Sequence, residues 1–589
     1  MKLSDYVMNF IKEQGVDDVF MLPGGGAIHL IDSLGKSKLN YICNLHEQAS
    51  SISAGAYSEY TNNLGVCLIT TGPGGTNTIT GVAGAWLDSI PVLFISGQVQ
   101  TKDINTSNVR QIGFQEINIV DIVKPITKYA VTVTNPLMIR YHLERAIYTA
   151  THGRKGPVWI DIPLDVQATN ISPEALNYYR EPEITKHSIE DIVSEIIADL
   201  NNSKKPIILA GNGIRSSKAI NDFLELIDIL KIPVLTTWKA IDFLEEEHPL
   251  YVGRPGGVGQ RGANFSQQNS DFFISIGARL DHGQIAYKQE LFAPKATKVI
   301  VDIDCNEISK FKMDIKYKIT SDARNFIKEF IKQKNKVNIN CENWLSKCKH
   351  LQEKYPVCLP EYWKENDHVN NYVFIEALSK VLPEGSLVIP GSSGCCSEVT
   401  MQTLKMKKGM RVFNTEGLGS MGFGIPAAIG ACIASGKQET ICIDGDGGFV
   451  MNIQELETVR RLNLPIKFFV INNNGYVSIR NTQDKHFNGV HIASDNDSGL
   501  TLPSWSKIAN AFDITYIKID SHNKINEQIK LILDSSGPVI CDVKVSYNHI
   551  TAPKVSVQKN KDGSFSARPM EDMEPFIDRK EFEENMSDV

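Results

Sequence analysis

The sequence has no uninterrupted apolar run of about 18 residues or more, the length that a helix needs to cross a bilayer. Its first residues, MKLSDYVMNFIKEQG, mix apolar and charged positions at helical spacing and do not have the composition of a secretory signal. Both absences argue against membrane insertion and secretion. We therefore expect a cytoplasmic protein.

Other classes are disfavoured in the same way. The net charge is −7 at pH 7, so no basic excess is present to attract nucleic acid. The 11 cysteines form no paired CxxC motifs, and Cys395 and Cys396 are adjacent, which argues against a zinc framework and favours reduced thiols. No GxGxxG follows the first predicted strand, which disfavours a simple dinucleotide oxidoreductase. No repeat of solenoid length is visible.

Strand-like and helical runs alternate three times along the chain, and the hydrophobic content of 42% supports ordinary globular cores. This alternation predicts an α/β protein with three doubly wound parallel-sheet domains. We place them at residues 1–175, 188–345 and 365–550, separated by two polar stretches. Residues 551–589 form a polar, turn-rich tail that we expect over the surface or over an active-site mouth.

The segment GDGGFVMNIQELETVRRLNLPIKFFVINNNG (residues 445–475) contains the most informative pattern. The apolar run TICI (residues 440–443) predicts a strand that leads into a tight glycine turn carrying Asp446. Asn452 and Glu455 have the spacing of a helix N-terminal capping pair, and the predicted helix continues until Pro465 stops it. A second buried strand over residues 466–471 then opens onto three asparagines.

Parallel strands joined by a helix end at the same edge of a sheet, so Asp446 and Asn473 are expected to face one point. A carboxylate, an amide oxygen and a loop carbonyl are hard donors that suit Mg²⁺ or Ca²⁺. The glycines would let backbone N–H groups approach phosphate oxygens. The alternative is an ordinary Asp-Gly turn followed by an asparagine-rich loop.

The N-terminal unit supplies a candidate acid. Glu47 lies near the start of a predicted helix in NLHEQASSISAGAY, and the loops PGGG and TTGPGG would line the same rim of the sheet. On position alone, the favoured interpretation of Glu47 is a helix-start carboxylate that interacts with the helix dipole.

Taken together, HEQ, TTGPGGTN, DSIPVLFISGQV, GFQE, GPVWIDIPLD, GLGSMGFGIPAAIGA and GDGGF…NNN resemble the acetolactate synthase (acetohydroxyacid synthase) branch of the thiamine-diphosphate enzymes. The motifs occur in the same order from residue 1 to about residue 550. The resemblance implies thiamine diphosphate and Mg²⁺ as cofactors. It also implies a homodimer or homotetramer in which each site lies between the pyrimidine-binding unit of one subunit and the diphosphate-binding unit of another.

The resemblance further implies roles for single residues. Glu47 matches the glutamate that hydrogen-bonds the cofactor's aminopyrimidine and promotes its active tautomer. Phe114 and Gln115 match residues on the donor side of the site. Matches to the cofactor-binding positions are Ser392, Ser393, Gly419, Met421, Gly447 and Gly448, and matches to the metal ligands are Asp446, Asn473 and the carbonyl of Gly475.

The middle unit resembles the flavin-binding domain of acetolactate synthases, with Gly211, Arg279 and Asp302 near the expected dinucleotide. Its isolated glycines are a weak signal on their own. We expect FAD in a structural role, and the alternative is a scaffold that binds no flavin.

The acceptor side departs from the family pattern. His282 and Gly283 replace an aspartate and an arginine, Leu164 replaces a lysine, and Thr482 replaces a tryptophan. A 2-ketoacid acceptor needs a cation for its carboxylate, so these differences predict an acceptor without one. The pocket candidates are His29, Asn481, Thr482 and Gln483, although His29 could equally be a surface helix histidine.

We therefore expect a thiamine-diphosphate-dependent decarboxylating carboligase. It would transfer a two-carbon unit from pyruvate to a carbonyl acceptor such as a keto-sugar nucleotide. The alternatives are a true acetolactate synthase, a decarboxylase, a carbon–carbon bond hydrolase, or a nucleotide-binding scaffold without chemistry.

Overall fold

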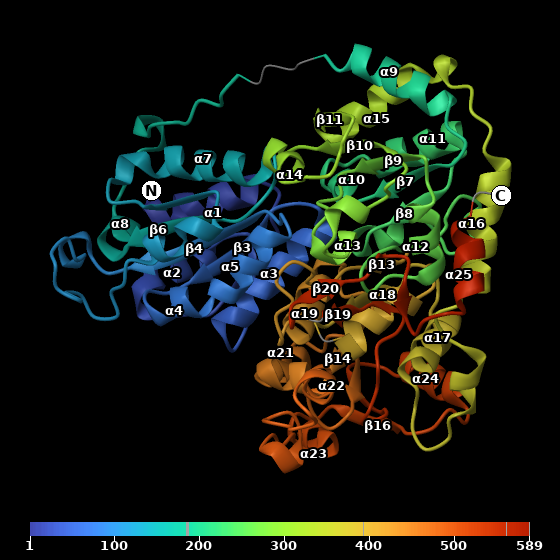
Figure 1. The fold of residues 1–589 in the computed structure, drawn as a ribbon. Helices are drawn as coiled ribbons and strands as arrows, with labels where there is room; N and C mark the ends of the chain where they lie inside the picture. Colours follow the sequence, from blue (N-terminus) through green and yellow to red (C-terminus); the bar gives the residue numbers. More distant parts are fainter. Residues whose placement is uncertain (184–187, 393, 561, 588–589) are drawn as a thin grey trace.

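The computed structural model describes residues 1–183, 188–392, 394–560 and 562–587. Three α/β units are visible in Figure 1, with the N-terminal unit at the left, the middle unit at the upper right and the C-terminal unit at the lower right. Each is built on one sheet in which all strand pairs are parallel, as the alternating pattern predicted. Within the described part of the chain, no helix is long and apolar enough to span a membrane.

The N-terminal unit has a six-stranded sheet in the order β2-β1-β3-β4-β6-β5. Apolar residues of α1, α2 and α7 pack on one face, and those of α3, α5 and α6 pack on the other. The elements are β1 (Asp18–Met21), β2 (Asn40–Cys43), β3 (Gly65–Ile69), β4 (Val92–Gln98), β5 (Tyr129–Thr132), β6 (Val158–Pro163), α1 (Leu3–Glu13), α2 (Ile28–Lys36), α3 (Glu47–Thr61), α4 (Pro73–Asn77), α5 (Ile79–Leu87), α6 (Ile119–Val123), α7 (Ile139–Thr151) and α8 (Leu164–Ala168).

The middle unit has a five-stranded sheet in the order β11-β10-β9-β7-β8. Its strands are short apolar runs buried on both faces, which is typical of parallel sheets covered by helices. The elements are β7 (Pro206–Ala210), β8 (Val234–Thr236), β9 (Phe272–Ile276), β10 (Thr297–Asp302), β11 (Tyr317–Thr320), α9 (Glu190–Asn201), α10 (Gly213–Ser216), α11 (Ile220–Leu230), α12 (Arg261–Gln268), α13 (His282–Ile285), α14 (Cys305–Ser309), α15 (Ala323–Lys332) and α16 (Glu342–Lys354).

The C-terminal unit has a six-stranded sheet in the order β13-β12-β14-β15-β17-β16. Its strands are β12 (Leu387–Pro390), β13 (Arg411–Val412), β14 (Thr440–Gly445), β15 (Ile466–Asn472), β16 (Thr515–Ile519) and β17 (Val539–Lys544). Its helices are α17 (Asn371–Val381), α18 (Val399–Thr403), α19 (Gly424–Ala434), α20 (Asp446–Phe449), α21 (Leu456–Arg461), α22 (Val477–His486), α23 (Trp505–Ala511) and α24 (Ile525–Leu533).

The tail packs mainly on the middle unit. Two short hairpins, β18 (Lys554–Val555) with β21 (Met573–Glu574) and β19 (Val557–Lys559) with β20 (Phe565–Ala567), lead to α25 (Arg579–Met586). In Figure 1 α25 lies beside α16, and the Tyr355 hydroxyl donates a hydrogen bond to Glu581 Oε1 at 2.5 Å. The tail also satisfies polar side chains of the wholly buried α12, since Asn264 donates to the Met570 carbonyl at 2.9 Å.

The N-terminal and C-terminal units share one core because two helices of small residues cross closely. A Cβ on Gly430 of α19 would lie 2.1 Å from the Ser53 carbonyl oxygen of α3, so only glycine allows this approach. The Ser53 hydroxyl also donates to the Pro426 carbonyl at 2.8 Å. Apolar residues of α3, α19, α21 and α23 therefore belong to a single cluster.

Charged residues join all three units at one buried point. Lys239 of the middle unit pairs with Glu59 at 2.5 Å and with Asp88 at 3.5 Å, and it donates to the Asn414 carbonyl. Asp242 pairs with Arg215 at 2.5 Å and with Arg411 of the C-terminal unit at 2.8 Å. Because each buried charge has an opposite charge or a carbonyl partner, the cluster fixes the relative positions of the units.

Two local predictions were wrong. Asp446 does not lie in an open turn: β14 runs through Gly445, and the helical conformation starts at Asp446, which is buried. Asn452 and Glu455 do not cap a helix start. Asn452 lies at a kink between helical segments and donates to the Gly422 carbonyl, while Glu455 accepts from Asn44 and from the Leu45 N–H of the N-terminal unit. Tertiary partners have replaced the local capping interaction.

Candidate active site

The Asp446 carboxylate lies at the ends of β14 and β15, where the parallel pairing brings both strands to one edge. Oδ2 accepts hydrogen bonds from the backbone N–H groups of Asn473 at 3.0 Å and Gly475 at 3.1 Å, and Oδ1 accepts from the Gly447 N–H at 2.8 Å. Burial raises the pKa of Asp446 to about 6, and these N–H donors oppose the rise. The predicted metal-ligand residues thus come together.

The Asn473 side chain is held at both ends. Its Nδ2 donates to Cys395 Sγ at 3.4 Å, and its Oδ1 accepts from Arg480 Nη2 at 3.1 Å. Gly475 adopts a φ of +140°, and a Cβ there would lie 2.3 Å from the Ser494 carbonyl oxygen. Only glycine can occupy this position without moving the neighbouring loop.

This donor set fits Mg²⁺. Among the described residues, no three His, Cys, Asp or Glu side chains gather in a form that could hold a metal ion. A metal here would instead be held by one carboxylate, one amide oxygen and one backbone carbonyl, with phosphate oxygens completing the shell. Asp446, which follows β14, and Asn473 and Gly475, which follow β15, supply those three kinds of oxygen at one sheet edge.

The glycines after Asp446 are required by packing. A Cβ on Gly447 would lie 2.2 Å from Tyr476 Cε1 and 3.4 Å from Met421 Cε, and one on Gly448 would lie 2.7 Å from Asp444 Oδ1. Among the described residues, the buried Ser392 hydroxyl has no hydrogen-bond partner, which suits a polar ligand such as a phosphate. Ser393, the other predicted contact, lies outside the described residues.

Gly419 and Met421 lie in the loop before α19. Gly419 has a φ of +61°, and apart from its chain neighbours no described atom lies within 4 Å of where a Cβ would be, so its conformation and not crowding favours glycine there. Met421 is half-buried against the Gly447 turn. The structure therefore places the predicted pyrimidine-side residues beside the predicted diphosphate-side residues within one unit.

Glu47 is the first residue of α3, and it is 8% exposed. His46 precedes it as the N-cap and accepts from the Gln48 N–H at 3.0 Å, while Asn77 donates to Glu47 Oε2 at 3.0 Å. Among the described residues, no hydrogen bond joins Glu47 to the Asp446 loop of the same chain. A single chain therefore does not link these two groups directly.

The predicted donor-side residues lie on an open loop. Phe114 is 88% exposed, and Gln115 has a φ of +62°. The Gln115 carbonyl packs against Gly72, where a Cβ would lie 2.3 Å from that oxygen. The loop is thus anchored at Gly72, while the Phe114 ring is left largely uncovered by the described residues.

The predicted acceptor residues come from two units. His29 is half-buried in the first turn of α2, and its carbonyl accepts from Lys2. On α22, Asn481 donates to the His549 carbonyl at 2.9 Å, Thr482 is exposed and donates to the Ser478 carbonyl, and the Gln483 amide donates to the Ile492 carbonyl. Among the described residues, no hydrogen bond joins His29 to α22.

The middle unit opens onto a cavity of about 470 Å³, within the usual range of small-molecule sites. It lies beyond the ends of β7, β9 and β10 and against residues 87–89 and 151–155 of the N-terminal unit. Arg279 and Asp302, which the sequence placed near a dinucleotide, line this cavity. Gly211 does not; it packs against the end of β9, where a Cβ would lie 2.3 Å from the Gly277 carbonyl oxygen.

Several site residues escaped the sequence reasoning. Arg480 and Cys395 contact Asn473, and Glu416 lines the middle cavity with a pKa raised to about 7 by burial and by Asp281 and Asp88. Burial and the neighbouring Asp446 raise the pKa of Asp444 to about 7. The local signal for Arg480 was weak: it is a charged residue that directly follows Ile479.

Three family models match the chain in order. They are the thiamine pyrophosphate enzyme N-terminal TPP binding domain over residues 1–122, the central domain over residues 193–330 and the C-terminal TPP binding domain over residues 392–543. Thiamine pyrophosphate is thiamine diphosphate. The first and third matches contain Glu47 and Asp446.

Known relatives match almost end to end. The chain is 32% identical to the acetolactate synthase large subunit of Cyanidium caldarium, over 94% of this chain and 95% of the relative. It is 31% identical to the acetolactate synthase large subunit of Lactococcus lactis subsp. lactis, over 94% of each chain. It is 30% identical to the acetolactate synthase isozyme 2 large subunit of Escherichia coli, over 92% and 96%.

Three findings agree with the resemblance drawn from the motifs. Each unit has a parallel sheet, a buried acid lies with hard oxygen donors at one sheet edge, and the family models and relatives match in order along the chain. The bound cofactor of such enzymes is thiamine diphosphate. The chain belongs to the acetolactate synthase family of thiamine-diphosphate-dependent enzymes.

Proposed function

We propose that this enzyme joins a two-carbon unit from pyruvate, released with loss of carbon dioxide, to a carbonyl acceptor that has no carboxylate, such as a keto-sugar nucleotide. When bound, thiamine diphosphate supplies the electron sink for decarboxylation. The residues of this chain hold the cofactor, place a proton-sharing carboxyl group at the pyrimidine and shape the acceptor pocket.

The orientation of α22 carries this proposal. Arg480 is the only charged residue among its first seven positions (residues 477–483), and its side chain is buried against Asn473. The exposed positions Ser478, Ile479 and Thr482 are uncharged. A carboxylate on the acceptor would therefore meet no exposed cation among residues 477–483, and nothing there would compensate the cost of removing it from water.

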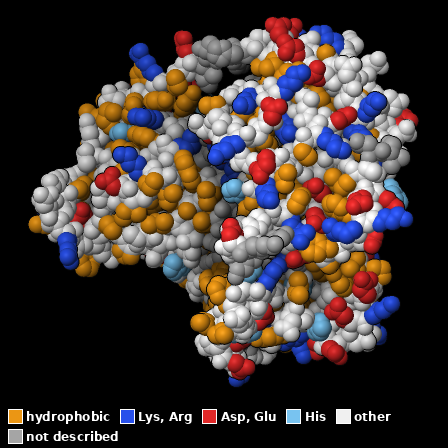
Figure 2. Space-filling view, in the orientation of Figure 1, with side chains coloured by type: hydrophobic (Ala, Val, Ile, Leu, Met, Phe, Trp, Pro, Cys, Tyr) orange, Lys and Arg blue, Asp and Glu red, His pale blue; other side chains and the backbone are white. Residues whose placement is uncertain are grey.

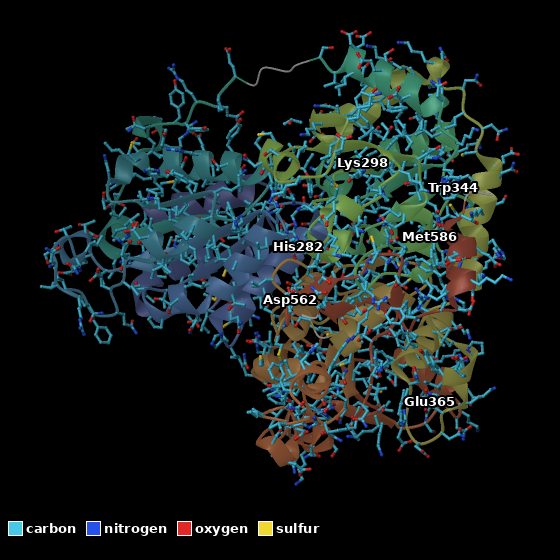
Figure 3. The ribbon with its side chains drawn as sticks, in the orientation of Figure 1. His282, Lys298, Trp344, Glu365, Asp562 and Met586 are labelled. Atoms are coloured by element: carbon cyan, nitrogen blue, oxygen red, sulfur yellow. The ribbon has the colours of Figure 1, made fainter. Side chains whose placement is uncertain are left out.

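Two further positions support the same acceptor chemistry. Leu164 begins α8 with a half-buried apolar side chain. His282 is exposed at the start of α13, stacked on Tyr287 at 5.6 Å between ring centroids, and lies near the boundary of the N-terminal and middle units in Figure 3. The arginine of the family pattern is replaced by the next residue, Gly283, which offers no charge to a carboxylate.

For the cofactor, we assign Mg²⁺ to Asp446 Oδ, Asn473 Oδ1 and the Gly475 carbonyl, and the diphosphate to the Ser392 and Gly447–Gly448 side. We assign the pyrimidine to Glu47, Gly419 and Met421. We assign the pyrimidine-binding domain to residues 1–175, the central domain to residues 188–345 and the diphosphate-binding domain to residues 365–550. They rest on the hydrogen bonds around Asp446, the buried Ser392 hydroxyl and the family matches.

We also propose a homodimer or a dimer of dimers in which Glu47 of one chain completes the site of another. The side of the N-terminal unit seen in Figure 2 carries mainly apolar and uncharged side chains, whereas charged side chains crowd the middle unit. Exposed apolar residues occur on both proposed halves of the site, at Ile112 and Phe114 on one unit and Phe487, Val490 and Ile492 on the other. A partner chain would bury them.

The cavity of the middle unit fits a flavin dinucleotide in a structural role. Its rim carries Arg154, Lys155 and Lys218, which suit phosphates, and its volume falls in the range for cofactor sites. Mass spectrometry of the non-covalent ligands released from purified protein tests this cofactor and thiamine diphosphate together. Release of thiamine diphosphate without any flavin would contradict the flavin proposal.

The reaction is tested by supplying pyruvate alone, pyruvate with 2-ketobutyrate, and pyruvate with neutral ketones or keto-sugar nucleotides. We expect an adduct with an uncharged carbonyl acceptor and little acetolactate. Acetaldehyde as the sole product in every mixture would establish a decarboxylase, and efficient formation of acetolactate would establish a true acetolactate synthase. The combined variant Leu164→Lys/Gly283→Arg/Thr482→Trp should shift product toward acetolactate.

A further inference from the structure

Arg480 stands out because it is a cation buried to 1% exposure for which, within the described part of the chain, no carboxylate forms an ion pair. A buried charge is costly unless hydrogen bonds compensate it. Here backbone oxygens do so: Nη1 donates to the Ser494 carbonyl at 3.0 Å, and Nη2 donates to the Tyr547 carbonyl at 2.7 Å. The guanidinium carbon also lies 3.8 Å from the centre of the Tyr547 ring.

The remaining contacts of Arg480 are with one residue of the proposed metal loop. Nη2 lies 3.1 Å from both the backbone carbonyl oxygen and the side-chain Oδ1 of Asn473. The guanidinium has only donors, so the amide atom that faces it must be the oxygen. At the other end of the amide, Nδ2 donates to Cys395 Sγ. Arg480 and Cys395 together fix which way the amide points.

We propose that Arg480 is a positioning residue for the metal: it orients Asn473 Oδ1 and clamps the loop of residues 473–475 between the Ser494 loop and the segment at Tyr547, which precedes the tail. An amide oxygen has two lone pairs, so the one not used by Arg480 is free for a cation. The inference rests on the metal site proposed above and is independent of the acceptor.

Arg480 packs closely against the loop of residues 473–475. A Cβ on Gly475 would lie 2.8 Å from Arg480 Nη1, and Gly475 N–H also donates to Asp446 Oδ2. Asp446, Asn473, Gly475 and Arg480 therefore form one hydrogen-bonded group. Lysine cannot replace the arginine, because a single ammonium group cannot reach acceptors on three separate segments in the planar geometry of a guanidinium.

Arg480→Lys is the decisive variant, with Arg460→Lys as its matched control, since Arg460 is exposed on α21 and pairs only with Glu457. Protein freed of metal with EDTA is titrated with Mg²⁺ at fixed thiamine diphosphate, and binding is followed by calorimetry and by tryptophan fluorescence. Trp505 is a suitable reporter because it packs against Phe449, three residues after Asp446, at 5.5 Å between ring centroids.

We expect Arg480→Lys to raise the Mg²⁺ concentration at half-saturation by about 10- to 100-fold, the usual effect of removing a residue that orients a metal ligand. Arg460→Lys should leave it unchanged. An unchanged value for folded Arg480→Lys would overturn the proposal. So would weaker thiamine diphosphate binding with unaltered Mg²⁺ dependence, because Arg480 would then contact the phosphate itself.

Two further variants complete the test. If Arg480→Lys does not fold, Cys395→Ala carries the prediction, because loss of the acceptor for Nδ2 should also weaken Mg²⁺ binding, though less; an unchanged value would refute the clamp. Asp446→Ala separates this inference from the proposed metal site. If Asp446→Ala binds Mg²⁺ and cofactor normally, the site itself is wrong; if it does not and Arg480→Lys does, only the role of Arg480 is wrong.

Discussion

Asp446 accepts a hydrogen bond from the backbone N–H of Asn473 at 3.0 Å, although 27 positions separate the two residues in the sequence. The contact exists because β14 and β15 are parallel neighbours, which brings the residues that follow both strands to one edge of the sheet. It gives the C-terminal unit a preformed group of hard oxygen atoms, and the first prediction follows from it.

Replacing Asp446 with alanine should abolish Mg²⁺-dependent retention of thiamine diphosphate. The variant removes the only carboxylate of the proposed donor set and leaves the N–H groups of Asn473 and Gly475 without their acceptor. Cofactor content after gel filtration, with and without Mg²⁺, measures the effect. Glu457→Ala, on the exposed surface of α21, is the control. Undiminished binding in Asp446→Ala would contradict the metal assignment.

Glu47→Gln should lower turnover by about 100- to 10,000-fold, the range for loss of a positioned acid–base group. Glutamine keeps the size of the side chain and can still contact Asn77, so the fold and cofactor binding should remain. Steady-state pyruvate consumption and cofactor content measure the two effects separately. Glu13→Gln, at the exposed end of α1, should behave as wild type. Full turnover in Glu47→Gln would remove the proposed mechanism.

Asp242→Ala should lower stability by roughly 3–5 kcal/mol, because it leaves the buried guanidinium groups of Arg215 and Arg411 without their shared carboxylate. Burial alone would raise the pKa of Asp242, but Arg215 and Arg411 outweigh it and lower the pKa below its ordinary value. The stabilisation is therefore present above the unfolded pKa and is lost as pH falls through the folded pKa.

Thermal unfolding measured from neutral to acidic pH tests this interpretation of Asp242. The wild type should lose more stability on acidification than Asp242→Ala does. The control is Glu457→Ala, which breaks a solvent-screened surface pair with Arg460 and should change stability little. A variant as stable as the wild type at pH 7 would show that the cluster does not hold the units together.

Glu416→Gln should stabilise the protein at neutral pH. Burial, Asp281 and Asp88 raise the pKa of Glu416 to about 7 in the folded chain, above its unfolded value, so the folded state binds the proton more tightly. Stability contributed by this group is present below the unfolded pKa and falls as pH rises to about 7, by about 3 kcal/mol in all. The wild type should therefore lose stability relative to Glu416→Gln between pH 5 and pH 8, as midpoints of thermal unfolding would show.

A constant difference between the two proteins across that range would mean that Glu416 does not titrate there. Glu361→Gln, at an exposed position of the segment before α17, is a suitable control for the loss of one carboxylate.

The sequence by itself determined the α/β class, the three parallel sheets and the residues grouped around Asp446. These depend on local patterns: TICI and IKFFVI are strands buried on both faces, and the glycines and asparagines that follow them can only lie at the sheet edge where the strands end. The order of the motifs was also sufficient to indicate the family.

Tertiary structure alone decided the rest. Glu455 has the spacing of a capping residue, yet it accepts hydrogen bonds from Asn44 and Leu45, about 410 positions away. Arg480 has the local sequence of a surface helix residue, yet it is buried against Asn473 and Tyr547. Local periodicity specifies which face of a helix is apolar, but a polar side chain takes the partners that folding brings to it, and those come from distant segments.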